Sequence, residues 1–110
     1  GKLALQEPDK MKPILREWID DPNHMWLRRT ALLVQLKHKT NTNSDLLYEL
    51  CRKRMHEKEF FVRKAIGWAL REYSKTDPQG VLAFLEQEKA NLSGLSYREG
   101  SKFLVKRGFM

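Results

Sequence analysis

The sequence predicts an all-α fold, an α-solenoid of about three helix pairs arranged as a right-handed stack of antiparallel helices. Apolar residues recur at helical spacing in six successive segments, which are separated by short polar connections. Part of this pattern repeats after 34 to 35 residues. A helix pair repeated at this period buries its apolar face only against its neighbours, as in an α-solenoid.

Proline and polar residues mark the first three predicted helices. Pro8 and Pro13 place the start of the first helix, whose apolar spacing continues to Trp18 before "DDPN". The second helix follows Asn23 and extends through "HMWLRRTALLVQLKHK". Ser44 is the predicted cap of the third helix, "DLLYELCRKRMH".

The last three predicted helices carry clearer signals. The fourth, "EFFVRKAIGWALREYSK" (59–75), has an apolar stripe of Val62, Ile66, Ala69, Leu70 and Tyr73. Asp77 before Pro78 predicts the start of the fifth, "PQGVLAFLEQEKA". Ser96 and Glu99 match a capping box, which predicts a sixth helix ending near Gly108. We expect residues 1–110 to form one domain.

The repeat is visible when "WLRRTALLVQL" (26–36) is set over "FFVRKAIGWAL" (60–70). This offset of 34 aligns Arg29 with Arg63, and a further shift of 35 aligns Arg63 with Arg98. The W-x-x-L-G-x-x-Y pattern of tetratricopeptide repeats is absent. Each repeat has an apolar residue and an Arg, with a small residue two positions after the Arg. This pattern resembles HEAT repeats, so HEAT-like helix pairs are expected.

The composition favours an anionic partner. The 110 residues contain 21 Lys and Arg against 14 Asp and Glu, a net charge of +7. Nucleic acid is the first candidate, because no basic segment has the Trp- and Phe-rich apolar face that binds a membrane surface. The sequence has no spanning segment or signal peptide, and its single cysteine, Cys51, excludes an internal disulfide, so a cytoplasmic protein is expected.

Trp68 is the first candidate functional residue. On a helical wheel it lies opposite the apolar stripe, in a strip with Lys64, Arg71 and Lys75. Lys37, Lys102 and Lys106 come near the same surface in a stack of helix pairs. Together these side chains form a candidate track for a phosphate backbone with an aromatic ring in its middle. The alternative is that Trp68 packs against a neighbouring helix.

Arg29 is the second candidate, because it is predicted to project between Leu33 and Leu36. An arginine in an apolar sector needs a carboxylate, carbonyl groups or a ligand anion. One interpretation is a structural arginine of a HEAT repeat, paired with Asp20 or Asp21. The other is a residue that binds a ligand.

Three segments resemble the bacterial DNA alkylation repair glycosylases of the AlkD-like group, which are built of HEAT-like repeats. They are "NHMWLRRTALLVQLKHK", "EKEFFVRKAIGWALREYSKTDP" and "LSGLSYREGSK". The resemblance implies a bacterial protein that hydrolyses the N-glycosidic bond of N3- or N7-alkylated purines in double-stranded DNA. We expect a monomer without cofactor or metal.

The resemblance also implies roles for both candidates. Trp68 matches the tryptophan that lies against the DNA backbone at the lesion, and Arg29 matches the active-site arginine. Both are therefore expected in the catalytic site, with Lys37, Lys64, Arg71, Lys75 and Lys102 binding DNA. The family's "WWDxxD"-like motif, which holds the catalytic aspartate, is absent, so the chain is expected to be the C-terminal half of such an enzyme and inactive alone.

Other catalytic patterns are weak. His24, His38 and His56 lack the spacing of a helical metal pair, and no nucleophile or phosphate-loop motif occurs. Two alternatives to the enzyme stay open: a DNA-binding HEAT module without catalysis, and a HEAT-type protein scaffold. A Trp with an Asp four positions later, encoded just before Gly1, would favour the enzyme.

Overall fold

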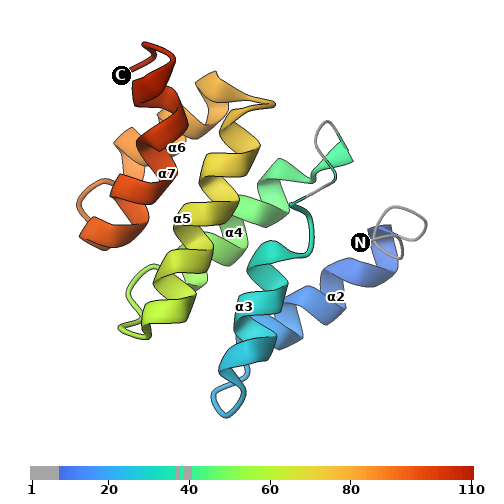
Figure 1. The fold of residues 1–110 in the computed structure, drawn as a ribbon. Coiled ribbons are helices and arrows are strands. Elements are labelled where there is room, and N and C mark those ends of the chain that lie inside the picture. The colour runs from blue at the N-terminus through green and yellow to red at the C-terminus, as the bar shows by residue number, and fades with distance from the viewer. Residues whose placement is uncertain (1–7, 37, 39–40) are drawn as a thin grey trace.

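The computed structural model describes residues 8–36, 38 and 41–110, and in these ranges all regular structure is helical (Figure 1). The six helices are α2 (Pro8–Ile19), α3 (Met25–Leu33), α4 (Ser44–Arg54), α5 (Phe60–Ser74), α6 (Pro78–Glu88) and α7 (Gly94–Lys106). None of them is long and apolar enough to cross a membrane.

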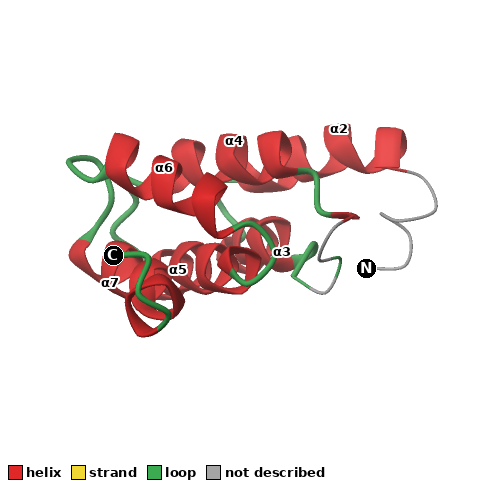
Figure 2. Ribbon diagram, turned by 90° about the horizontal axis from the view of Figure 1, so that it is seen from above, coloured by secondary structure: helices red, strands yellow, loops and turns green. Residues whose placement is uncertain are grey.

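The helices form two layers (Figure 2). One layer contains α2, α4 and α6, the other contains α3, α5 and α7, and the chain passes from one layer to the other at every connection. Side chains with at most 1% of their surface exposed fill the space between the layers, among them Leu15, Leu50, Ile66, Leu85 and Leu104. Each such side chain contributes about 1.5–3 kcal/mol relative to an exposed position.

The apolar stripe predicted for residues 59–75 is confirmed. Val62, Ile66 and Leu70 are fully buried, Ala69 is 3% exposed, and Tyr73 is partly buried against the same core. Cys51 is also fully buried, and this burial raises the pKa of its thiol to about 12. It therefore packs as a small neutral side chain.

The second helix is shorter than predicted. The pattern indicated a helix continuing through Lys39, but α3 ends at Leu33 and Val34–Leu36 form turns. The Gln35 side chain accepts a hydrogen bond from the Asn43 backbone N–H at 2.7 Å, which fixes the approach to α4. Helical periodicity carries no information about this contact. Lys37 lies outside the described residues.

Two of the three predicted caps are wrong. Asp77 does cap α6, accepting from the Gly80 N–H at 3.0 Å. The cap of α4 is Asn43 instead of Ser44, and the cap of α7 is Ser93 instead of Ser96. Ser96 lies inside α7, where its hydroxyl donates to the Arg63 carbonyl of α5 at 2.8 Å, so tertiary packing outweighs its local capping tendency.

Helices α5 and α7 approach each other closely at Gly67. A Cβ atom added there would lie 2.7 Å from the Cβ of Glu99 and 3.2 Å from the carbonyl oxygen of Ser96. A side chain at this position would therefore force the two helices apart. The close approach brings Glu99 of α7 next to the residues that flank Gly67.

Candidate nucleic-acid interface

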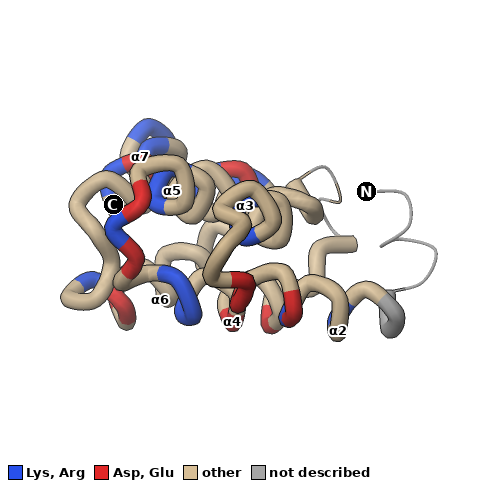
Figure 3. The backbone as a smooth tube through the Cα atoms, turned by 90° about the horizontal axis from the view of Figure 1, so that it is seen from below, with Lys and Arg blue, Asp and Glu red and all other residues tan. Residues whose placement is uncertain are grey.

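The positive charge is concentrated in one layer of the fold. Helices α3, α5 and α7 together contain eight Lys and Arg residues and two Glu, whereas α2, α4 and α6 contain six basic and six acidic residues. Figure 3 shows basic positions gathered around α5 and α7, whereas acidic and basic positions are mixed on the opposite layer. The excess charge of these helices thus faces one side, where a polyanion would bind.

Charges on the opposite layer neutralise one another in ion pairs between its helices. Arg16 of α2 binds Glu49 of α4 through two hydrogen bonds of 2.7 and 2.9 Å. Arg52 of α4 lies 3.0 Å from Glu88 of α6. Hydrogen bonds from these arginines hold the pKa values of both glutamates below the ordinary range. These cations stabilise the stack and leave little positive charge for a ligand.

Trp68 stands in a hollow of about 260 Å³ on the basic layer. Lys64 and Arg71 of α5 line the hollow with it, and Glu99 comes from α7. Trp68 keeps 38% of its surface exposed, whereas Ile66 and Leu70 on the same helix keep none. The position of Trp68 therefore differs from that of a core residue between two helices, and its ring is accessible to a ligand.

Glu99 connects this hollow to Lys102, another predicted DNA-binding residue. The two side chains of α7 form an ion pair, and 16% of the Glu99 side chain is exposed. The ion pair with Lys102 lowers the pKa of Glu99, and the charges of Arg71 and Lys64 lower it further. Glu99 is therefore an ionised carboxylate among three cations.

The structural arginine of the second helix is Arg28 and not Arg29. Arg28 is 8% exposed and donates to Glu57 at 2.6 Å and to the Asp21 carbonyl oxygen at 2.7 Å. The predicted apolar sector around Arg29 was wrong, because the buried face of this segment includes Ala31, Leu32 and Gln35, which follow Arg28 at helical spacing. The run "ALLVQL" is apolar on several sides, so its pattern did not define one face.

The buried arginine also changes the alignment of the repeat, because an offset of 35 aligns Arg28 with Arg63. Arg63 of α5 donates to the Glu57 carbonyl oxygen at 2.8 Å, in the connection before its own helix. Arg28 makes the same kind of bond to the connection before α3. The equivalent of Arg63 is therefore Arg28, and Arg29 has no part in this structural contact.

Arg29 is instead partly exposed beside an aromatic cluster. Its guanidinium lies 5.3 Å from the centre of the Trp26 ring, and Trp26 lies 5.7 Å from Phe61 of α5. Phe61 contacts Phe60 at 5.4 Å, and the Lys64 ammonium lies 5.8 Å from the Phe60 ring. This series of contacts connects Arg29 to the hollow around Trp68.

The aromatic cluster of Trp26, Phe60 and Phe61 was not predicted as part of the site. These rings are 57%, 52% and 45% exposed, respectively. The repeat alignment already placed Trp26 opposite Phe60, and this was the available signal. Exposed aromatic rings between cations provide the flat faces on which sugars and bases of nucleic acids pack.

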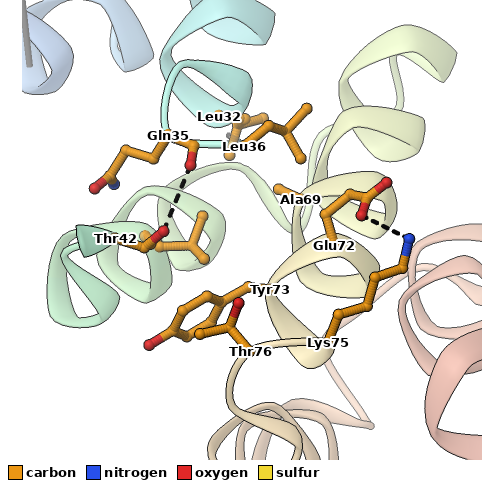
Figure 4. A pocket seen from close by; sticks show the side chains of 10 residues that line it. Leu32, Gln35, Leu36, Thr42, Ala69, Glu72, Tyr73, Lys75 and Thr76 are labelled. Carbon is orange, nitrogen blue, oxygen red and sulfur yellow. Dashed lines mark hydrogen bonds and ion pairs between the residues drawn. The ribbon is translucent and has the colours of Figure 1, made fainter. Parts of the chain in front are cut away.

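Lys75 lies apart from the Trp68 hollow. It pairs with Glu72 at 2.9 Å and lines a cavity of about 290 Å³ between α3, α4 and α5 (Figure 4). The interior of this cavity is formed largely by apolar groups, including Leu32, Leu36 and Ala69. Within the described part of the chain it contains no other predicted site residue, so the candidate interface is the basic layer and not this cavity.

The described residues contain no group of three or more His, Cys, Asp or Glu side chains that could hold a metal ion. His24 contacts Asp21 at 3.1 Å in an exposed turn.

The fold and this surface define an all-helical protein whose one layer has the cations and exposed rings of a nucleic-acid-binding face. The chain belongs to the DNA alkylation repair enzyme family, whose sequence model matches residues 1–104. A solved structure of a predicted DNA alkylation repair enzyme from Enterococcus faecalis is 40% identical, with a TM-score of 0.83. The match covers 94% of this chain and 47% of that chain, so the chain spans about half the length of this relative. A comparison with curated proteins found no match.

Proposed function

We propose that this chain supplies the DNA-binding face and part of the active site of a DNA glycosylase that removes N3- or N7-alkylated purines. The observation that carries the proposal is the exposed Trp68 ring between Lys64 and Arg71, in a member of a DNA alkylation repair family. The two alternating layers and the repeated Arg28 and Arg63 contacts support a HEAT-like solenoid.

The proposed reaction needs little acid catalysis. Alkylation at N3 or N7 makes the purine cationic, so the glycosidic electron pair leaves with the base and neutralises it. The sugar then becomes positively charged until water adds to it. The enzyme must stabilise this positive charge, which a carboxylate or an aromatic face in a partly closed site can do.

Each site residue then has a role suited to its surroundings. Trp68 offers its ring to the sugar at the lesion. Arg29 binds a phosphate, because its planar donors suit phosphate oxygens and it makes no ion pair with a described residue. Lys64 and Arg71 contact the backbone beside Trp68, and Lys102 extends the track along the layer. Lys75, which lies apart from the hollow, and Lys37 are proposed as further DNA contacts.

The catalytic carboxylate is proposed to lie outside these 110 residues. Helices α3, α5 and α7 contain only two acidic residues, and both are ion-paired, Glu72 with Lys75 and Glu99 with Lys102. The active site would then be completed by residues encoded before Gly1, with this chain as the C-terminal half of a bacterial, cytoplasmic and monomeric enzyme. The same observation favours the second candidate, a DNA-binding module without catalysis.

Measuring base release separates these two functions. DNA containing N7-methylguanine should lose the base at the uncatalysed rate with this chain alone and much faster with a protein extended upstream of Gly1. Losing a preorganised charge costs about a hundredfold to a thousandfold in rate. DNA without protein provides the background. Binding without release by the extended protein would support the non-catalytic module, and rapid release by the 110 residues alone would place the carboxylate among them.

A further inference from the structure

Among the described residues, Glu99 is the one carboxylate that lines the Trp68 hollow. Its backbone is held in place by the close approach of α7 to Gly67 and by the hydrogen bond from Ser96 to the Arg63 carbonyl. Its side chain is mostly buried. The side chain of Glu72, which also contacts Trp68, is 29% exposed and lines the other cavity. A negative charge is thus built into the most positive part of the basic layer.

The surrounding charges exclude a role for Glu99 as a receptor for the cationic base. Lys64 and Arg71 line the hollow, and Lys102 pairs with its carboxylate Glu99, which gives three positive charges against one negative charge. Glu72 also contacts Trp68, but its charge is paired with that of Lys75. A cation entering this site would meet net repulsion, whereas a phosphate would be attracted. Glu99 therefore acts on the phosphate-binding cations.

The ion pair affects Lys102 most directly. Lys64 and Arg71 make no ion pair with a described residue, but the ammonium of Lys102 is bound to Glu99. A phosphate that contacts Lys102 must compete with this carboxylate, and a phosphate beside Trp68 must approach it. Both effects weaken binding to any phosphate, because the backbone carries the same charge at every position.

We propose that Glu99 is a specificity-determining residue that keeps Lys102 from ordinary DNA phosphates and limits the affinity of this face for undamaged DNA. The inference rests on the proposed function, because it requires that the basic layer binds duplex DNA. If binding along undamaged DNA is weak, the contacts made at a lesion supply a larger share of the total binding free energy. Glu99 is then a positioning residue that acts through Lys102.

The test is the salt dependence of binding of undamaged duplex DNA by the Glu99→Gln variant. The variant should bind about fivefold more tightly near 0.1 M salt, as expected for removing one charge near a phosphate. The slope of log affinity against log salt should become steeper by about 0.9, because one more counterion is released. Adding Lys102→Met to Glu99→Gln should return both values to those of the wild type.

Glu86→Gln is the matched control, since it removes the same charge from the exposed face of α6 in the opposite layer. It should change neither value. A Glu99→Gln variant with unchanged or weaker binding would overturn the inference, as would a lower melting temperature with an unchanged salt slope. Tighter DNA binding by the double variant Glu99→Gln, Lys102→Met than by the wild type would also contradict the inference. If the wild type did not bind DNA at all, both this inference and the proposed function would fail.

Discussion

At the scale of single residues, Arg28 and Arg29 show how one helical step changes the role of a side chain. Arg28 is buried and satisfied by Glu57 and a backbone carbonyl, whereas Arg29 faces the Trp26 ring at the surface. A mostly buried ion pair contributes to stability only while both partners are present, because a single buried charge is unfavourable. An arginine at the surface can be removed without such a cost.

The two arginines should therefore respond oppositely to alanine. Arg28→Ala should lower the free energy of unfolding by about 3 kcal/mol, because Glu57 would lose its closest partner and keep only Arg54 at 3.7 Å. Arg29→Ala should change it by less than about 0.5 kcal/mol but weaken DNA binding. Thermal melting and binding measured on the same preparations test both. A large loss of stability in Arg29→Ala with unchanged binding would contradict its assignment to DNA.

Trp68 should affect catalysis more than binding. In a protein that includes the upstream residues, Trp68→Ala should slow release of N7-methylguanine more than it weakens binding to undamaged duplex DNA. The reason is that its ring is proposed to meet the positive charge of the sugar during the reaction. Single-turnover release and equilibrium binding are the two measurements. Equal losses in both would reduce Trp68 to a general backbone contact.

At the scale of helices, the position of α7 on α5 determines the shape of the Trp68 hollow. Gly67 permits the close approach, and the buried Ser96 hydroxyl joins the helices through the Arg63 carbonyl. In the other layer, ion pairs between Arg16 and Glu49 and between Arg52 and Glu88 connect α2, α4 and α6. One layer is thus held by close backbone packing and the other partly by charge.

Gly67→Ala should separate α5 from α7. The added methyl group would lie 2.7 Å from the Glu99 Cβ, so the helices must shift, at a cost of about 1–3 kcal/mol in urea unfolding. Gly94→Ala is the control, because a Cβ there has no neighbour within 4 Å. It should be neutral or slightly stabilising. Equal stability of the two variants would show that α7 is not closely packed at Gly67.

The ion pairs of the other layer predict a loss of stability in acid. The pKa of Glu88 is lowered from 4.5 in the folded protein, chiefly by the hydrogen bond from Arg52. A lowered pKa contributes stability above the unfolded value, and this stability is lost as the pH falls through the folded value. Unfolding free energy should therefore decrease below about pH 4.5, and Glu88→Gln should make this decrease smaller. If Glu88→Gln left the decrease at low pH unchanged, the Arg52–Glu88 pair would contribute nothing to the pH dependence of stability.

At the scale of the whole molecule, the segregation of charge is the basis for proposing one layer as the DNA-binding side. A track of about four to six phosphate contacts should give a slope of log affinity against log salt of about −4 to −5 on duplex DNA. Fluorescence anisotropy of the 110-residue chain over a series of salt concentrations measures this slope. Binding that does not depend on salt would contradict the proposal that a track of Lys and Arg side chains contacts the phosphates.

The sequence alone predicted the helices, the apolar stripe of α5, the Asp77 cap and the basic strip around Trp68, because these depend on residues within one or two helical turns. Only the tertiary structure decided that Arg28 is the buried arginine, that Ser96 joins α7 to α5 and that Glu99 enters the Trp68 hollow. Each of these features is a contact between residues about 30 positions apart. Helical periodicity determines which side chains share a face, but only the packing of helix against helix determines what that face contacts.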